Sequence, residues 1–301
     1  MGTHEQHLLL HGYQPKFAEL WNPEFLAFVV LLGVAYFMLI GPWRKRFIHA
    51  EPVSIGKQIT FMTALLTLYV AMGSPLYFYG HVSFTLHMTQ QSLLLMIFPP
   101  LFVLGLPVWF IRAVLQPVFV RKWFDRLTKP LISLFMFNLF FSVYHIPLVL
   151  DFVMQYHGVH IAYKLLLLFT AFMIWWHIIC PVPELQRIKN VKLMGYIFAA
   201  GVLMTPACAL IIFASQLVYE SYSYGPQLFA ILPILDDQQL GGVVMKMVQE
   251  TAYGVGLWHV FSKWYREENP TTGIDEIDPL ESFEPMEQRK ELTIVPTSGR
   301  V

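Results

Sequence analysis

Two side chains that can bind a metal ion stand at the start of one apolar stretch. The sequence FTLHMTQQSLLLMIFPPLFVLGLP, residues 84–107, is apolar enough to cross a bilayer, yet its first turns contain His87 and Met88. A polar group buried in hydrocarbon costs several kcal/mol unless it finds a partner. Imidazole and thioether together form a ligand set that suits copper, and the thioether favours Cu(I). The stretch therefore predicts a metal site near one end of a membrane helix.

Further candidate ligands stand at the ends of three other apolar stretches. His145 lies in FSVYHIPLVL, His157 and His160 lie three residues apart in MQYHGVHIAYK, and Asp237 immediately precedes the last apolar stretch. Residues at i and i+3 share a helix face, and ionisable groups inside a membrane are candidates for function. We expect His87, His145 and His160 to be the core metal ligands, with auxiliary ligands from His157, Met88 and Asp237.

Other polar side chains are expected to support this site. A metal-bound histidine usually needs a partner for its second nitrogen, and Gln91 and Gln238 stand near His87 and Asp237. Lys246 and Glu250 are spaced i, i+4, so an ion pair or a relay is geometrically possible. We expect Lys164 and Lys246 to reach the interface or to pair with Asp151, Asp236 or Asp237. The alternative is that these histidines and lysines are ordinary interfacial residues.

The elements that must position these residues are membrane helices. Of the 301 residues 56% are hydrophobic and 13% are charged, whereas a soluble protein carries about 25% charge. The formal net charge of zero indicates no nucleic-acid partner. We predict an all-α membrane protein with seven spans, each long enough to cross a bilayer, at residues 24–43, 58–76, 84–106, 131–150, 160–180, 194–218 and 240–261.

Lysine and arginine set the predicted orientation. They cluster in the connections after the first, third and fifth spans and are missing from the other three connections. Because positive residues favour the cytoplasmic side, we expect the N-terminus outside and the C-terminus in the cytoplasm. The predicted organisation is an external tail over residues 1–23, a membrane domain over 24–262 and an acidic, disordered cytoplasmic tail over 263–301. Every candidate ligand then lies toward the outer side.

Several motifs resemble those of the CtaG family of bacterial cytochrome c oxidase assembly factors, found with caa-type oxidases. They cover about residues 74–250 and are SPL at 74–76, HMTQQSLLLMIFPPLFVLGLP at 87–107, YHIP at 144–147, HGVH at 157–160, TP at 205–206 and DQQLGG at 237–242, with Glu250 in the last span. The resemblance implies a multi-pass protein of the bacterial cell membrane that matures the oxidase, with oxidase subunits as its partners. Many members of the family have histidine where this chain has Gln91.

The sequence and the resemblance together give one main hypothesis and two rivals. In the main hypothesis the chain is a chaperone, not an enzyme, that binds copper or delivers it to the oxidase at the outer leaflet. The first rival is a haem-binding membrane redox protein, because histidines from facing helices can serve as axial ligands. The second is a metal-free assembly scaffold in which the histidines only pack the bundle.

Overall fold

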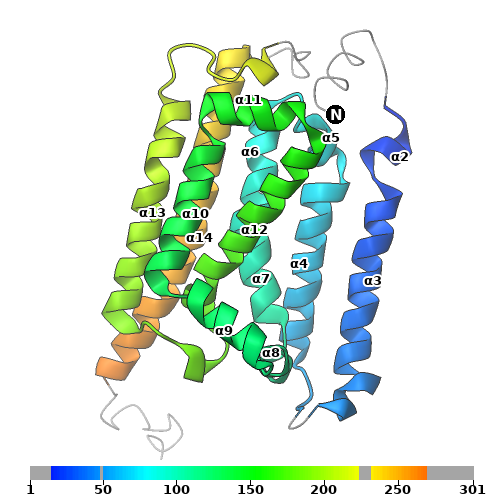
Figure 1. Ribbon diagram of the computed structural model, residues 1–301, viewed down its shortest axis with the longest axis vertical. Helices are drawn as coiled ribbons and strands as arrows, with labels where there is room; N and C mark the ends of the chain where they lie inside the picture. Colours follow the sequence, from blue (N-terminus) through cyan, green and yellow to red (C-terminus); the bar gives the residue numbers. More distant parts are fainter. Residues whose placement is uncertain (1–14, 48–49, 224–231, 270–301) are drawn as a thin grey trace, which may run out of the picture. The chain divides into compact units, whose positions relative to one another are not determined.

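The computed structural model describes residues 15–47, 50–223 and 232–269, and every regular element in these ranges is helical (Figure 1). Residues 1–261 form one compact unit and residues 262–301 form a second. The helix bundle belongs to the first unit. Residues 270–301 of the predicted acidic tail and residues 1–14 of the predicted external tail lie outside the described residues. The all-α prediction is confirmed for the described part of the chain.

Five helical segments in the described ranges are long and apolar enough to cross a membrane. A sixth span is possible if α9 (Val118–Leu127) and α10 (Pro130–Tyr144), bent by 69° at their junction, count as one. The five are α3 (Pro23–Ile40), α4 (Ile55–Gly73), the segment Phe84–Gly105, α12 (His157–Ile179) and α13 (Asn190–Ile212). The predicted seventh span falls in α14 (Ile234–Glu268), which is long enough but is not among the segments apolar enough to cross a membrane. The seven-span count is therefore not confirmed.

The segment Phe84–Gly105 has three parts, α6 (Phe84–Ser92), η2 (Leu93–Ile97) and α7 (Phe98–Gly105). The middle part, η2, is a π-helical turn. Proline has no N–H, so Pro99 leaves the carbonyl of Leu95 without its usual helical donor. The indole N–H of Trp175 donates to that carbonyl at 3.0 Å. A side chain from α12 thus satisfies the backbone at this break, as a membrane interior requires.

The long helices pack in the order α3, α4, α7, α12, α10 and α13, each against the next. Helix α14 lies against α6 and α13 through two adjacent glycines. A Cβ on Gly241 would meet the Phe84 ring at 2.6 Å, and one on Gly242 would meet Ile211 and Ile212 at 2.9 Å. The glycine pair of DQQLGG therefore permits close helix packing.

Short helices and turns close the two ends of the bundle (Figure 1). The α11 end, at the top of the figure, contains α5 (Pro75–Tyr79), α11 (Pro147–Gln155) and η4 (Glu220–Tyr222). The α9 end, at the bottom, contains η1 (Pro42–Arg46), α8 (Val108–Val114), α9 and η3 (Pro183–Leu185). A four-residue helix, α2 (Phe17–Leu20), precedes α3. Which end faces outward stays a prediction from the lysines and arginines.

Candidate functional site

Three buried imidazoles meet at the α11 end. His81 comes from the turn between α5 and α6, His87 from α6 and His160 from the first turn of α12. The His81 and His160 ring centres are 5.6 Å apart, and those of His87 and His160 are 6.4 Å apart. All three residues are at most 3% exposed. Of the predicted core ligands, the structure thus brings His87 and His160 together. We call His81, His87 and His160 the histidine cluster.

His81 was not among the ligands expected from the sequence, because it stands in a turn outside the apolar stretches. The usable signal was its position six residues before His87, across a tight turn that carries Gly80. Burial, with a smaller contribution from the Lys164 charge, lowers the pKa of the His81 imidazole to about 3. The ring is therefore neutral at physiological pH, which is the form in which histidine binds metal.

A lysine is buried beside the histidine cluster. Lys164 lies one turn after His160 on α12, is 5% exposed, and donates to the Gln90 side-chain carbonyl at 3.3 Å. Its ammonium lies 4.7 Å from the centre of the Tyr77 ring, and that ring is 5.0 Å from the His81 ring. The expected pairing with an aspartate is therefore replaced by an amide and an aromatic face. When protonated, Lys164 is a positive neighbour of the imidazoles.

His145 lies at the end of α10, next to Tyr144, whose ring stacks on that of His87 with centres 6.1 Å apart. The Nδ1 atom of His145 lies 2.8 Å from the Phe141 carbonyl. A carbonyl only accepts hydrogen bonds, so in the neutral ring Nδ1 carries the proton and Nε2 keeps its lone pair. In the described structure the buried Nε2 atoms of His145 and His160 have no hydrogen-bond partner. Both are candidate metal-binding atoms.

Three predicted auxiliary ligands lie apart from the histidine cluster. Met88 is fully buried, but its side chain packs on α14, with Cγ 3.2 Å from the position of a Cβ on Gly241. Asp237 caps α6: its carboxylate accepts from the Ser83 hydroxyl at 2.8 Å and from the Phe84 N–H at 2.7 Å. His157 is exposed at the first position of α12. The shared face expected from the i, i+3 spacing does not bury both histidines, because the helix begins at His157.

Of the predicted supporting residues, one lies next to the histidine cluster and the others lie elsewhere. Gln91 is buried and its amide faces the Tyr144 hydroxyl, so it stays next to the histidine cluster. Gln238 accepts from the Val218 N–H at 2.9 Å and thereby fixes the chain that leads into η4. Lys246 and Glu250 form the ion pair that their spacing allows, at 2.6 Å, but the Glu250 side chain is 58% exposed. That pair belongs to the surface of the bundle.

The donor set can be compared with what a metal ion needs. Two imidazoles that share an ion through nitrogens about 2.0 Å from it have ring centres about 6 Å apart, which is the spacing within the histidine cluster. Across the described residues, no three His, Cys, Asp or Glu side chains are grouped as ligands of one ion. The histidine cluster therefore supplies imidazole nitrogens at a suitable spacing, but the described residues do not form a complete site for one ion.

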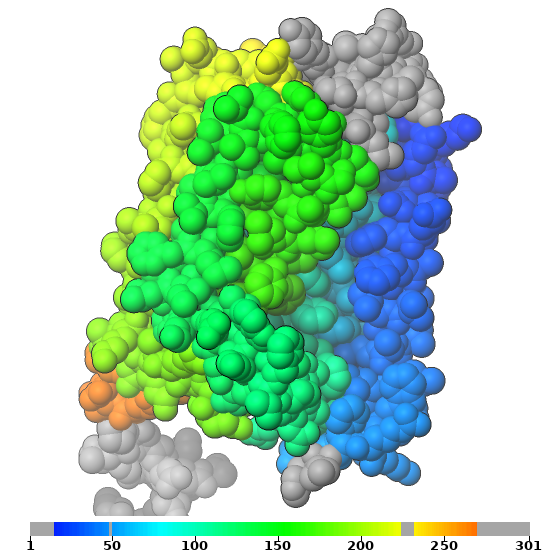
Figure 2. Space-filling view, viewed as in Figure 1, coloured from blue at the N-terminus to red at the C-terminus, as the bar shows by residue number. Residues whose placement is uncertain are grey.

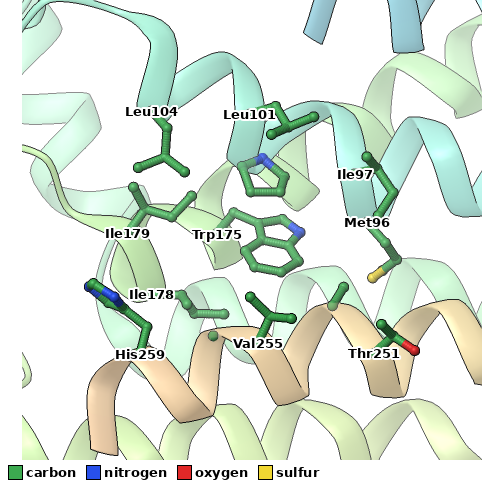
Figure 3. Close-up of a pocket in the computed structure, with 13 residues that line it drawn as sticks. Met96, Ile97, Leu101, Leu104, Trp175, Ile178, Ile179, Thr251, Val255 and His259 are labelled. Atoms are coloured by element: carbon green, nitrogen blue, oxygen red, sulfur yellow. The ribbon is translucent and has the colours of Figure 1, made fainter. Parts of the chain in front are cut away.

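The other half of the bundle contains an apolar pocket of about 410 Å³ between α7, α12 and α14 (Figure 3). Met96, Leu101, Trp175 and Val255 point into it, and His259 lies at its edge. These side chains offer hydrocarbon and one aromatic face rather than convergent ligands.

The fold and the histidine cluster define a multi-pass helical membrane protein with buried imidazole side chains at one end. Residues 34–267 match the family of the cytochrome c oxidase caa3 assembly factor, Caa3_CtaG, and the chain belongs to this family. The resemblance found in the motifs is thus confirmed.

Curated relatives include two mycobacterial proteins. The chain is 26% identical over 255 residues to the uncharacterized protein Mb0105 of Mycobacterium bovis, covering 79% of this chain and 38% of that protein. It is 26% identical over 274 residues to the uncharacterized protein ML1998 of Mycobacterium leprae, covering 84% of this chain and 41% of that protein. The chain therefore spans about two fifths of the length of these relatives. No solved structure matches it.

Proposed function

We propose that this chain is a non-catalytic assembly factor that binds copper at its α11 end and delivers it to a caa3-type oxidase. The family supplies the link to oxidase assembly. In this proposal the α11 end faces outward from the bacterial cell membrane, as the lysines and arginines predict. Copper is the cargo, and oxidase subunits are the acceptors.

The observation that carries the proposal is the meeting of three buried imidazoles from three separate segments. Burying a polar ring in a membrane domain costs free energy unless it gains a partner. At neutral pH these rings offer nitrogen lone pairs, and imidazole binds copper well. His87 and His160 are the proposed principal ligands, with His81 joining them in place of the auxiliary ligands Met88, His157 and Asp237. His145 is a fourth candidate ligand, because its buried Nε2 has no hydrogen-bond partner in the described structure.

The surroundings of the histidine cluster support delivery rather than permanent storage. When Lys164 is protonated it places a positive charge beside the histidine cluster, and like charges repel across a medium of low dielectric constant. Such a neighbour weakens the binding of any cation. A delivery protein needs a site from which an acceptor can remove the ion, so a weakened site of few ligands suits this role.

A metal-free scaffold is the second candidate, and one observation favours it. The described side chains include no group of three His, Cys, Asp or Glu placed to hold one ion. In a scaffold the imidazoles would only pack against Tyr144 and Tyr222, which contact His87. This candidate predicts no copper binding at the histidine cluster.

Copper binding by the purified protein separates the two candidates. Cu(I) affinity is measured by competition with a chromophoric chelator for wild type, for a His87→Gln, His160→Gln double variant and for His157→Gln. His157 is the matched control because it is exposed on the same helix, three residues from His160. The proposal expects the double variant to lose about 100-fold or more in affinity, since removing ligands or their supporting shell costs at least about tenfold each. Equal affinities in all three proteins, or no binding by wild type, would rule out the copper proposal and favour the metal-free scaffold.

A further inference from the structure

Helix α9 lies at the surface of the α9 end and is not part of the candidate site. It has ten residues and bends by 69° away from α10. Figure 2 shows this segment uncovered on the front of the bundle, near its lower end. Val118 is 84% exposed, Phe119 74% and Trp123 46%. An exposed helix with large apolar side chains needs a partner of matching chemistry.

One face of α9 combines aromatic rings with cations. Phe119, Lys122, Trp123 and Arg126 follow the i, i+3, i+4, i+7 spacing of a single helix face. The Phe119 and Trp123 rings are 6.3 Å apart, and the Arg126 guanidinium lies 5.5 Å from the centre of the Trp123 ring. All four side chains are exposed. We call these four residues the α9 face.

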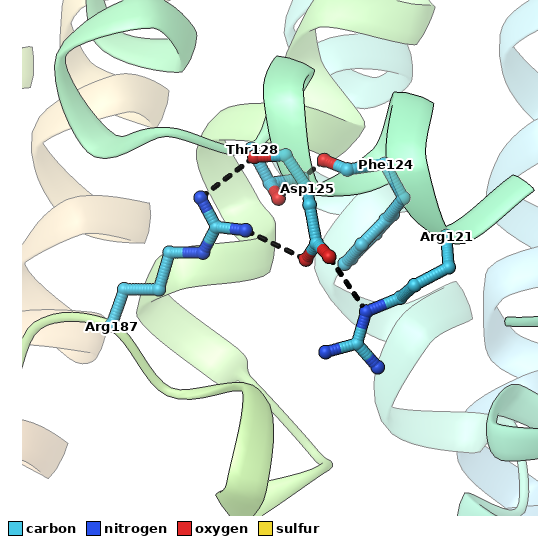
Figure 4. Close-up of polar contacts among 5 residues, drawn as sticks. All are labelled: Arg121, Phe124, Asp125, Thr128 and Arg187. Atoms are coloured by element: carbon cyan, nitrogen blue, oxygen red, sulfur yellow. Dashed lines mark hydrogen bonds and ion pairs between the residues drawn. The ribbon is translucent and has the colours of Figure 1, made fainter. Parts of the chain in front are cut away.

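The opposite side of α9 is fixed to the bundle. Phe124 packs edge-on against Trp176 of α12, with ring centres 4.9 Å apart. Asp125 pairs with Arg121 at 2.8 Å and with Arg187 at 2.7 Å (Figure 4). Arg187 also donates to the Asp125 backbone carbonyl at 2.8 Å. These contacts orient the helix so that the α9 face points away from the bundle.

The ion pairs also decide the charge of the exposed side. Burial alone would raise the pKa of the Asp125 carboxyl, but hydrogen bonds and charges from Arg121 and Arg187 outweigh it and lower the pKa. Asp125 is therefore ionised at physiological pH, and its charge is shared by those two arginines. Lys122 and Arg126 lie on the α9 face itself, so this face carries a net positive charge.

We propose that the α9 face binds the headgroup of an anionic phospholipid. Aromatic residues concentrate at the boundary between hydrocarbon and water, where Phe119 and Trp123 would rest. Ammonium and guanidinium groups bind phosphate oxygens through charge-assisted hydrogen bonds, and Lys122 and Arg126 stand beside those rings. Charge complementarity selects an anionic headgroup over a zwitterionic one, because each basic residue near an anionic surface contributes about 1 kcal/mol.

The test uses the full chain in bilayer discs that contain equal amounts of phosphatidylglycerol and phosphatidylcholine. After transfer to detergent, native mass spectrometry measures which lipid stays bound. Wild type is compared with a Lys122→Gln, Arg126→Gln variant and with a Lys189→Gln, Lys192→Gln variant. Lys189 and Lys192 are also exposed, at the start of α13. Substituting them removes the same amount of positive charge as substituting Lys122 and Arg126.

The proposal expects wild type to retain phosphatidylglycerol in preference to phosphatidylcholine. Removing Lys122 and Arg126 should lower that preference about thirtyfold, as two contributions of about 1 kcal/mol imply, while the control keeps it. Because all four substituted side chains are exposed, folding should be unaffected, and an unchanged melting temperature checks this. No preference in wild type, or an equal loss in both variants, would overturn the proposal; the latter would show that only total charge matters.

Discussion

The two ends of the bundle use polar residues in opposite ways. At the α11 end, histidines, a lysine and a capping aspartate point inward, where His87 is 1% exposed and Lys164 is 5% exposed. At the α9 end, the interior holds an apolar pocket and one buried histidine, His177, while ion pairs such as Arg112 with Glu184 lie on the surface with side chains more than half exposed. Buried polar groups cost free energy unless they find partners, whereas exposed ion pairs cost little, so the histidines and Lys164 at the α11 end reduce stability more than the surface ion pairs at the α9 end do.

Helix α12 runs through both regions and shows the contrast within one element. Its first turns supply His160 and Lys164 to the buried polar region, and its last turns supply Trp175 and Ile178 to the apolar pocket. The same helix therefore has buried polar side chains in its first turns and mainly apolar ones in its last turns. Substitutions at the α11 end should affect function and stability together, whereas those at the α9 end should affect surface interactions.

The largest effect on stability should come from Asp237→Ala. Three hydrogen bonds from Ser83, Phe84 and Thr85 would be lost, and the start of α6 would keep unsatisfied donors. We expect the free energy of unfolding to fall by about 3 kcal/mol, as for a partly buried charged cap that accepts several hydrogen bonds. Thermal unfolding in detergent measures it. Asp236→Ala is the control, since Asp236 is the exposed neighbour; equal losses in both variants would contradict the capping role.

The second effect is a pH dependence caused by His81. Its folded pKa of about 3 lies below the ordinary value of 6.5, so the unfolded chain binds more protons between these pH values. Stability should therefore fall as pH drops below 6.5, by about 2 kcal/mol between pH 7 and 5 from this residue. His81→Gln should reduce the slope of melting temperature against pH. An unchanged slope would mean that His81 is not buried as a neutral ring.

The third effect concerns the charge beside the histidine cluster. Lys164→Gln removes a positive neighbour, so the affinity for Cu(I) should rise about tenfold. Lys192→Gln, which removes a distant exposed charge, should leave that affinity unchanged. Chelator competition measures both. A fall in affinity in the Lys164 variant would indicate that the lysine supports metal binding instead of weakening it.

The smallest effect should come from the surface ion pairs of α9. Asp125→Asn breaks the contacts with Arg121 and Arg187, but side chains that are 29–44% exposed are well screened by water and salt. We expect a loss of less than about 1 kcal/mol. Because the pKa of Asp125 is lowered, this stabilisation is present at pH values above about 4 and is lost as pH falls through the folded pKa. A loss as large as that of Asp237→Ala would contradict the comparison of the two ends.

Much of the fold could be predicted from the sequence because hydropathy and helix length report directly on membrane spans. The predicted spans at 84–106, 160–180 and 194–218 coincide closely with helical segments that begin at Phe84, His157 and Asn190. The last predicted span, residues 240–261, was less clear from hydropathy alone. Helix α14 has Lys246 and Glu250 in its middle, and their mutual ion pair offsets a charge that hydropathy counts as unfavourable.

The candidate site was predicted only in part, because helix periodicity does not show what lies across an interface. His87 and His160 were expected to meet, and they do. Asp237 was expected to bind metal, yet it caps α6, a contact with residues more than 150 positions earlier in the chain. Likewise Met88 faces α14 because the glycine at 241 leaves room for it. Such long-range contacts depend on the tertiary arrangement and leave no spacing signal.

The central claim is that the histidine cluster at the α11 end performs the assembly function. Its most direct test is the copper content and activity of a caa3-type oxidase purified from a host that lacks its own assembly factor and produces either His160→Gln or His157→Gln. With equal amounts of both variants in the membrane, we predict an oxidase poor in copper and activity for His160→Gln and a normal one for His157→Gln. A normal, copper-loaded oxidase with His160→Gln would contradict the account.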